Sequence, residues 1–182
     1  TLDGSSAASD VYKRQLLMPA ILAGANPRIV NLSSAGHTHS DVNLDDHNFE
    51  KSEYNAWESY GRSKSANIHF TQEIVRRYGD RIQSFAVHPG VIMTELGRHL
   101  TPELMNEMSE RVKSRATSSS EAKETGALPF KSVEAGAATQ VWASVTEDLS
   151  ENNGAYLGDC QVGVEGGNPS ESGYLPYIFN RD

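Results

Sequence analysis

Short apolar segments alternate with helix-like segments along the middle of this chain. Arg28 to Ser33 forms a short apolar run rich in β-branched residues, and Ile82 to Val87 forms a second run. Runs of this kind are typical of parallel strands that are buried on both faces. Between them, residues 55–78 place apolar side chains at three- and four-residue spacing, which predicts an amphipathic helix. Strands that alternate with helices in this way predict βαβ units and a parallel sheet.

Further elements are expected on either side of this centre. Residues 16–23 read as the end of an apolar helix, and Thr101 caps a short helix over 102–113. A fourth helix begins after Ser132 and runs to about residue 145. Its inward-facing residues are predicted to be Ala135, Ala138, Val141 and Trp142. A last strand is expected over residues 154–162.

Polar residues dominate three other segments. We expect an exposed loop over residues 34–53, a mobile stretch over 114–127 and an irregular end over 163–182. The first of these contains His37, His39 and several aspartates, a composition that could be imagined as a metal site. The spacing matches no metal-ligand framework, so a solvated loop is the favoured interpretation and no metal is predicted.

Composition narrows the possible classes of protein. The 182 residues carry 16 basic and 24 acidic side chains, which gives a net charge of −8. This charge and the lack of a basic cluster argue against nucleic acid as a partner. No apolar run of 18 residues is present, so no membrane segment is predicted. A single cysteine, Cys160, excludes an internal disulfide and multi-cysteine zinc sites. Such sparse use of cysteine suits a reducing, cytoplasmic location. We expect the Cys160 side chain to lie in the core.

The first fifteen residues are predicted to lie outside the fold. Residues 5–15 read Ser-Ser-Ala-Ala-Ser-Asp-Val-Tyr-Lys-Arg-Gln, which is the in-frame translation of a transposase adapter used in sequencing libraries. A natural polar tail is the alternative, and segments that arise from processing are set aside before a fold is argued. We therefore expect the natural protein to continue upstream of Leu16, and residues 16–182 to form one domain.

Candidate chemistry is concentrated on the predicted helix over residues 55–78. Tyr60 and Lys64 are four residues apart, so their side chains lie on one face about one turn apart. A phenol is too weak an acid to ionise at neutral pH, and a nearby cation favours its phenolate form. This pair suits proton transfer to or from a hydroxyl or carbonyl group. The alternative is a solvated helix face on which an aliphatic lysine stem covers a tyrosine ring.

The surroundings of this pair resemble a known family. The segment Asn31-Leu32-Ser33-Ser34-Ala35-Gly36-His37 lies upstream and His88-Pro89-Gly90-Val91-Ile92-Met93-Thr94 lies downstream. With Tyr-x-x-x-Lys between them, this pattern resembles the short-chain dehydrogenase/reductases. The long gap before Tyr60 and the Tyr-Leu-Gly-Asp-Cys segment look most like the retinol dehydrogenase and WW-domain oxidoreductase branch. The resemblance implies an α/β fold, namely part of a doubly wound Rossmann-type parallel sheet with flanking helices and its N-terminal half missing.

The resemblance also implies an activity, an NAD(P)-dependent interconversion of an alcohol and a carbonyl on a small, apolar substrate. Ser34 would hydrogen-bond the substrate oxygen, Tyr60 would exchange the proton and Lys64 would hold the nicotinamide ribose, whereas the neighbouring Ser33 would be structural. The cofactor contacts implied by the family pattern are Ser33, Tyr60, Lys64, Pro89, Gly90, Val91 and Thr94. The family places a substrate loop at about residues 95–130, where Leu100, Leu104, Met105 and Met108 would line an apolar pocket or pack their helix down.

Two features of the family pattern are absent from this chain. The Gly-rich phosphate turn and the residue that selects NAD or NADP would both lie upstream of Leu16. We therefore expect these 182 residues alone to bind dinucleotide poorly and to be inactive. Two alternatives are a nucleotide-sugar epimerase of the same superfamily and a non-catalytic protein that uses the fold as an interaction surface. Oligomers of the parent protein are compatible with all three.

Overall fold

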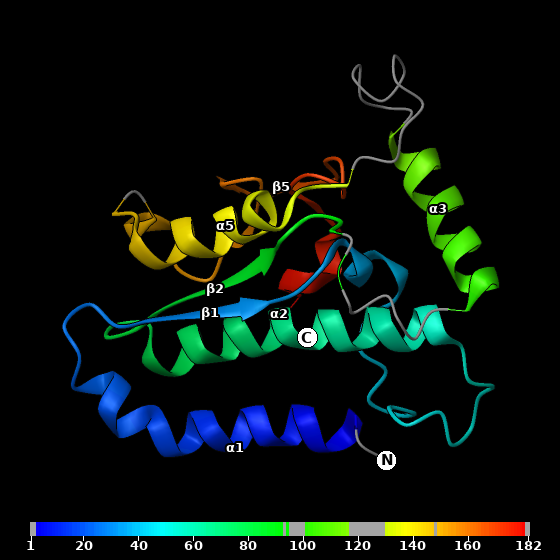
Figure 1. Cartoon of the computed structure of the whole chain (residues 1–182). Coiled ribbons are helices and arrows are strands. Elements are labelled where there is room, and N and C mark those ends of the chain that lie inside the picture. The colour runs from blue at the N-terminus through cyan, green and yellow to red at the C-terminus, as the bar shows by residue number, and fades with distance from the viewer. Residues whose placement is uncertain (1–2, 93, 95–100, 117–129, 148, 181–182) are drawn as a thin grey trace.

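A four-stranded sheet forms the centre of the computed structural model (Figure 1). Its strands, in spatial order, are β1 (Arg28–Leu32), β2 (Gln83–His88), β3 (Tyr156–Gly158) and β4 (Gln161–Val162). The first three run parallel and β4 is antiparallel to β3. The prediction of a parallel sheet is thereby confirmed. The structure describes residues 3–92, 94, 101–116, 130–147 and 149–180.

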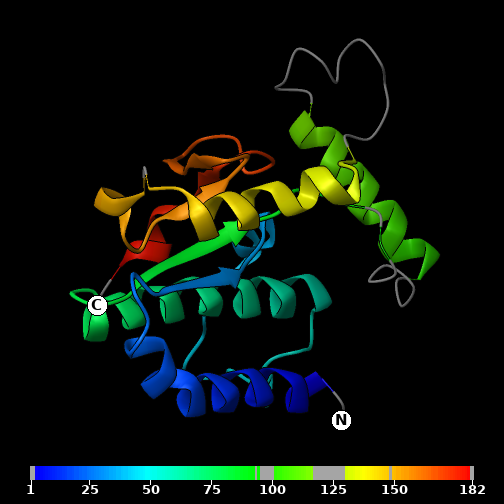
Figure 2. The same ribbon diagram turned by 60° about the vertical axis from the view of Figure 1, so that its left-hand side comes forward.

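Helices cover both faces of the sheet. Figures 1 and 2 show α2 (Ala56–Tyr78) along one face and α5 (Val133–Val145) along the other. The N-terminal helix α1 (Asp3–Leu22) lies on the outer side of α2, and α3 (Pro102–Ala116) stands apart from the sheet. Caps and apolar spacing in the sequence located α2, α3 and α5, whereas for α1 the sequence located only the C-terminal part.

The central strand β2 is deeply buried. Phe85, Ala86 and Val87 are completely inaccessible to solvent. Phe85 and Val87 belong to the core on the α5 side, whereas Ala86 packs with Ile68 of α2. A strand that must bury both faces reads as a continuous apolar run, and this explains the pattern in the sequence.

The predicted inward face of α5 is wrong except for Trp142. The side chain of Val141 is 59% exposed, and Gly136, Thr139 and Ala143 are the buried residues. A methyl group on Gly136 would lie only 2.0 Å from Cδ1 of Ile92, so a residue without a side chain lets the helix sit close to the chain after β2. Because the helix is rich in small residues on several faces, its sequence did not distinguish the buried face from its neighbour.

The predicted last strand is in fact a tight hairpin. Strands β3 and β4 are joined by Asp159 and Cys160, whose φ angles are 49° and 53°. Two successive positive φ angles are typical of the type I′ turns that connect antiparallel strands. The turn exposes Cys160, so its predicted core position is wrong.

Two segments predicted without regular structure contain short elements. The loop after β1 begins with the 3-10 helix η1 (Ala35–His39), and His37 within it is fully buried. The expectation of an exposed loop is therefore wrong for this part. The C-terminal segment contains a short parallel pair of strands, β5 (Val164–Glu165) and β6 (Gly173–Tyr174), and the 3-10 helix η4 (Pro176–Phe179). Another 3-10 helix, η3 (Ser150–Asn152), precedes β3.

Helix α1 continues into the segment predicted to lie outside the fold. It runs without interruption from Asp3 to Leu22, and the guanidinium of Arg14 lies 4.8 Å from the ring centre of Phe70 on α2. The adapter origin of residues 5–15 stays a prediction. The predicted mobile stretch lies mostly outside the described residues, as does Leu100. None of the described helices is both long enough and apolar enough to cross a membrane.

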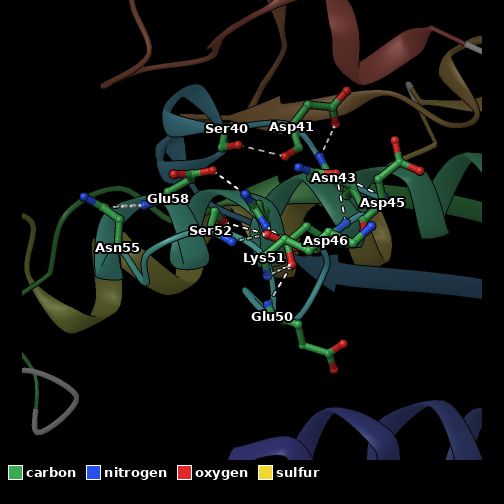
Figure 3. Close-up of polar contacts among 12 residues, drawn as sticks. Ser40, Asp41, Asn43, Asp45, Asp46, Glu50, Lys51, Ser52, Asn55 and Glu58 are labelled. Atoms are coloured by element: carbon green, nitrogen blue, oxygen red, sulfur yellow. Dashed lines mark hydrogen bonds and ion pairs between the residues drawn. The ribbon is translucent and has the colours of Figure 1, made fainter.

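One buried carboxylate organises the long loop between β1 and α2 (Figure 3). Asp46 is 7% exposed, and its Oδ1 accepts hydrogen bonds from the backbone N–H groups of Glu50 and Lys51 at 2.7 and 3.0 Å. Its Oδ2 accepts from the Ser52 hydroxyl at 2.6 Å and from the Ser52 N–H group at 2.9 Å. The Ser52 hydroxyl, and then these backbone groups, lower the pKa of Asp46 from 3.8 to about 2. The backbone carbonyl of Asp46 accepts from Arg62 of α2 at 2.6 Å, which anchors the loop to that helix.

We expect Asp46→Asn to lower the free energy of unfolding at neutral pH, because an amide cannot accept all four hydrogen bonds. The folded-state pKa lies below the ordinary value, so this contribution is present above pH 4 and is lost as the pH falls toward 2. Urea unfolding at several pH values measures both effects. Asp45→Asn changes an exposed neighbour and serves as the control. Equal stability of the two variants across this range would contradict the anchoring role.

Candidate active site

The predicted site residues gather where β1 and β2 end. Leu32, the last residue of β1, lies opposite Val87 of β2. Because the two strands are parallel, Ser33 and Ser34 leave the sheet at the same edge as Pro89 and the residues after it. Ligands of open parallel sheets bind outside the carboxyl ends of the strands, which is the edge in question.

The two adjacent serines have different surroundings. Ser33 is 4% exposed, and its hydroxyl donates to the backbone carbonyl of Lys64 at 2.9 Å. It therefore ties the end of β1 to α2, which agrees with the structural role implied by the resemblance. Ser34 caps η1, because its Oγ accepts from the N–H group of Gly36 at 3.0 Å. A hydroxyl that accepts one bond still has its proton to donate, so Ser34 can bind an oxygen atom of a ligand.

Tyr60 lies against the turn that holds Ser34. Its ring packs on Gly36 so closely that a methyl group there would lie 2.3 Å from Cε1 of the tyrosine. The same methyl group would lie 3.4 Å from Oγ of Ser34. Both side chains thus border the space beside Gly36. Tyr60 remains 38% exposed, which leaves it accessible from solvent.

Lys64 lies one turn along α2 from Tyr60, as predicted. Its ammonium nitrogen is 5.4 Å from the centre of the Tyr60 ring. The side chain is partly buried, and this burial lowers the pKa of Lys64. Within the described residues the ammonium makes no hydrogen bond or ion pair, so its donors are available to a ligand.

The chain after β2 makes a bend that requires glycine. Gly90 has a φ of +88°, and a methyl group there would lie 2.6 Å from Cδ of Lys131. The stem of Lys131 covers the bend, and its ammonium pairs with Asp159 of the β3–β4 turn. The backbone N–H of Lys131 also donates to the carbonyl of Val91 at 2.8 Å. Pro89, Gly90 and Val91 are therefore held in place by segments far along the chain, while Thr94 is exposed.

Two buried histidines belong to this site and were not identified as site residues from the sequence. His88 is the last residue of β2, and its Nδ1 accepts from the N–H groups of Ala35 and Gly90 at 3.2 and 3.4 Å. His37 lies in η1, where its Nδ1 is 2.8 Å from the carbonyl oxygen of Ser34. The available signal in the sequence was their position, since His37 follows Ser34 by three residues and His88 directly precedes the Pro-Gly bend.

A second phenol lies near Tyr60. Tyr156 of β3 is 1% exposed, and its hydroxyl has no hydrogen-bond partner among the described residues. Burial raises the pKa of Tyr156, and the neighbouring Tyr60 raises it further. Tyr156 therefore stays protonated at any physiological pH and is not suited to exchange protons with a ligand.

Helix α3 reaches toward this region from outside the sheet. Its Thr101 accepts from the N–H group of Leu104 at 3.3 Å, which confirms the predicted cap. Glu107 accepts from the indole nitrogen of Trp57 at 2.6 Å, so α3 contacts the first turn of α2. Leu104 and Met105 are half-buried, and their role as a pocket lining stays a prediction.

Sequence comparison finds related proteins over most of the chain, although no family model matches it. The oxidoreductase calI of Penicillium decumbens is 37% identical over 177 residues, which cover 92% of this chain and 49% of that protein. The short-chain dehydrogenase/reductase prx1 of Penicillium roqueforti is 39% identical over 93% of this chain and 48% of its own length. Retinol dehydrogenase 14 of Homo sapiens is 35% identical over 80% of this chain and 40% of its own. The chain spans about half the length of the curated relatives it matches.

Solved structures support the fold. Aldohexose dehydrogenase from Thermoplasma acidophilum matches with a TM-score of 0.52 at 20% identity, over 81% of this chain and 51% of that enzyme. The 3-oxoacyl-[acyl-carrier protein] reductase from Brucella melitensis matches with a TM-score of 0.51 at 22% identity, over 79% of this chain and 44% of that chain. These similarities confirm a Rossmann-type arrangement of the sheet and its helices.

Proposed function

Because this chain is related over most of its length to short-chain dehydrogenase/reductases and shares their fold, we propose that the whole protein is an NAD(P)-dependent oxidoreductase. In this proposal the whole protein interconverts the alcohol and carbonyl forms of a small, apolar substrate. One observation carries the proposal: Ser34, which follows β1, borders the same edge of the sheet as Tyr60 and Lys64 of α2.

These side chains divide the work of proton transfer. The Ser34 hydroxyl donates to the substrate oxygen and stabilises the negative charge that develops there during reduction. The Tyr60 hydroxyl delivers its proton to that oxygen, or takes one from an alcohol in the opposite direction. The ammonium of Lys64, 5.4 Å from the Tyr60 ring, favours the phenolate that remains.

The described residues fit a nicotinamide dinucleotide in one respect. A partly buried ammonium without a hydrogen bond or ion pair inside the described chain suits the hydroxyl groups of a ribose, and Lys64 provides it. Pro89, Gly90, Val91 and Thr94 would contact the rest of the nicotinamide end, whereas the buried Ser33 would support the site through its bond to the backbone of Lys64. The cofactor, when bound, supplies or accepts the hydride. The choice between NAD and NADP depends on a residue that the family pattern places upstream of this chain.

The proposal is tested by assaying the whole protein with NADH and NADPH against a panel of apolar aldehydes and ketones, and with NAD and NADP against the matching alcohols. We expect turnover with at least one pair, visible as a change in absorbance of the reduced nicotinamide. Binding of either dinucleotide without turnover on any member of the panel would favour an interaction protein. In a parallel assay with a sugar nucleotide, a change of its configuration without net reduction would favour an epimerase.

A further inference from the structure

One peptide unit of the site is hydrogen-bonded at both of its polar atoms by buried imidazoles. This unit joins Ser34 to Ala35. Its carbonyl oxygen lies 2.8 Å from Nδ1 of His37, and its N–H group lies 3.2 Å from Nδ1 of His88. His37 is fully buried and His88 is 2% exposed. The carbonyl oxygen also accepts from the backbone N–H group of His37 at 3.1 Å. The peptide unit cannot rotate without losing the bonds to both imidazoles, and a buried peptide group that loses partners is costly.

The polarity of these bonds determines where each ring carries its proton. A carbonyl oxygen only accepts, so Nδ1 of His37 is protonated and donates. A backbone N–H group only donates, so Nδ1 of His88 is unprotonated and the ring carries its proton on Nε2. Nε2 of His37 accepts from the N–H group of Leu175 at 3.4 Å and is therefore unprotonated. The two imidazoles are neutral and have opposite tautomers.

Both rings connect the turn that contains Ser34 and Ala35, called the serine turn below, to other parts of the fold. Nδ1 of His88 also faces the N–H group of Gly90 at 3.4 Å, which links the turn to the bend after β2. The ring of His37 lies edge-on to Tyr156, with 5.0 Å between the ring centres. The carbonyl of His37 accepts from the hydroxyl of Tyr177 in η4. The orientation of the Ser34–Ala35 unit is thus set by β2 on one side and by the C-terminal segment on the other.

We propose that His37 and His88 are positioning residues that clamp the Ser34–Ala35 peptide unit and thereby aim the Ser34 hydroxyl. This proposal rests on the proposed function, because it takes Ser34 to be the group that binds the substrate oxygen. Rotation about the Cα–C bond of Ser34 changes the direction of its Cα–Cβ bond relative to this peptide unit, so a fixed orientation of the unit limits where the hydroxyl points. Displacing a catalytic group by about 1 Å can reduce turnover by about 10²-fold.

Paired substitutions separate the clamp from simple packing. His37→Phe and His88→Phe keep a ring but remove both nitrogens. His37→Asn and His88→Asn place an amide near the position of Nδ1, where its NH₂ can donate to Ser34 or its oxygen can accept from Ala35. In the whole protein we expect each Phe variant to lose about 10²-fold in kcat with an unchanged KM for the nicotinamide cofactor, and each Asn variant to recover most of this loss.

His69→Phe is the matched control, because His69 lies on α2 and pairs with Asp41 at 2.8 Å without bonding to the serine turn. It should keep the kcat of the unaltered protein. Circular dichroism melting shows which variants fold. Phe variants that fold and keep full kcat would overturn the proposal, and so would folded Asn variants that are as slow as the Phe variants.

A second measurement does not depend on turnover. In the whole protein with ¹⁵N-labelled histidine, nitrogen chemical shifts at neutral pH should show His37 protonated at Nδ1 and His88 protonated at Nε2. Identical tautomers, or a doubly protonated ring at either position, would overturn the clamp. If the unaltered protein turns over no alcohol or carbonyl, the proposed function fails, and the tautomer pattern still decides whether the clamp exists.

Discussion

Replacing Tyr60 with Phe is expected to abolish nearly all turnover of the whole protein while leaving binding of the nicotinamide cofactor intact. The substitution removes one hydroxyl and keeps the ring that packs on Gly36. A positioned acid or base contributes roughly 10²- to 10⁴-fold to a rate, and we expect a loss of kcat in this range. Steady-state kinetics gives kcat, and fluorescence titration with NADH and NADPH gives the dissociation constants.

The control for this substitution is Tyr54→Phe. Tyr54 precedes α2, is 66% exposed and has no place in the proposed chemistry. It should keep both kcat and cofactor affinity. Turnover of Tyr60→Phe equal to that of the unaltered protein would refute the assignment of Tyr60, whereas loss of cofactor binding in this variant would point to a role in holding the nucleotide.

Adding a single methyl group at Gly36 is expected to slow the enzyme almost as severely. The methyl carbon of Gly36→Ala would lie 2.3 and 2.6 Å from Cε1 and Cδ1 of Tyr60, too close for any real contact. The ring is 38% exposed and can swing outward to relieve the collision. Because misplacement by about 1 Å can cost about 10²-fold, we expect kcat to fall by that order with cofactor affinity unchanged.

Gly24→Ala provides the comparison for this variant. Gly24 follows α1, away from the serine turn, and a methyl group there would lie 3.2 Å from the nearest atom, a backbone oxygen of Ile21. A small adjustment accommodates it, so kcat should be unaltered. If Gly36→Ala were equally active, the close packing of Tyr60 on the serine turn would have no bearing on catalysis.

Much of the fold follows from local features of the sequence. Helix α2 begins after Asn55, whose side chain accepts from the N–H group of Glu58 at 3.0 Å, and it ends at Gly79. Such caps and a stripe of apolar residues can be recognised without knowledge of the rest of the chain. The buried strand β2 is equally clear, because every residue from Ser84 to His88 is covered and most are apolar.

Other parts depend on contacts between distant segments and could not be predicted. The buried face of α5 is decided by how closely Gly136 approaches Ile92, and the residues of that helix are too uniform to show it. Cys160 is exposed because the chain reverses direction at Asp159. The sequence predicted one continuous strand over this segment, and a continuous strand has no such turn. A polar residue such as His37 is buried only because Leu175, 138 positions away, returns to cover it.

In the candidate site, too, some residues could be predicted from local sequence and others could not. The spacing of Tyr60 and Lys64 and the serines after a strand were enough to select the residues that the structure places at one edge of the sheet. Their chemical roles stay predictions until turnover is measured. The histidines that hold the Ser34–Ala35 unit were not selected, because their function depends on which backbone atoms face them, and this is a property of the assembled fold.

The reversal at Asp159 also offers a practical handle. Cys160 is the only cysteine of the chain, it is exposed, and its turn is joined through Asp159 to the lysine that covers the Gly90 bend. Within these 182 residues a maleimide dye would therefore attach at one place only, near the Gly90 bend against which the proposed nicotinamide would lie. The experiment uses the whole protein with any cysteine outside these residues replaced. The emission of the dye would report arrival and departure of the nucleotide in real time, without a radioactive tracer or a turnover assay.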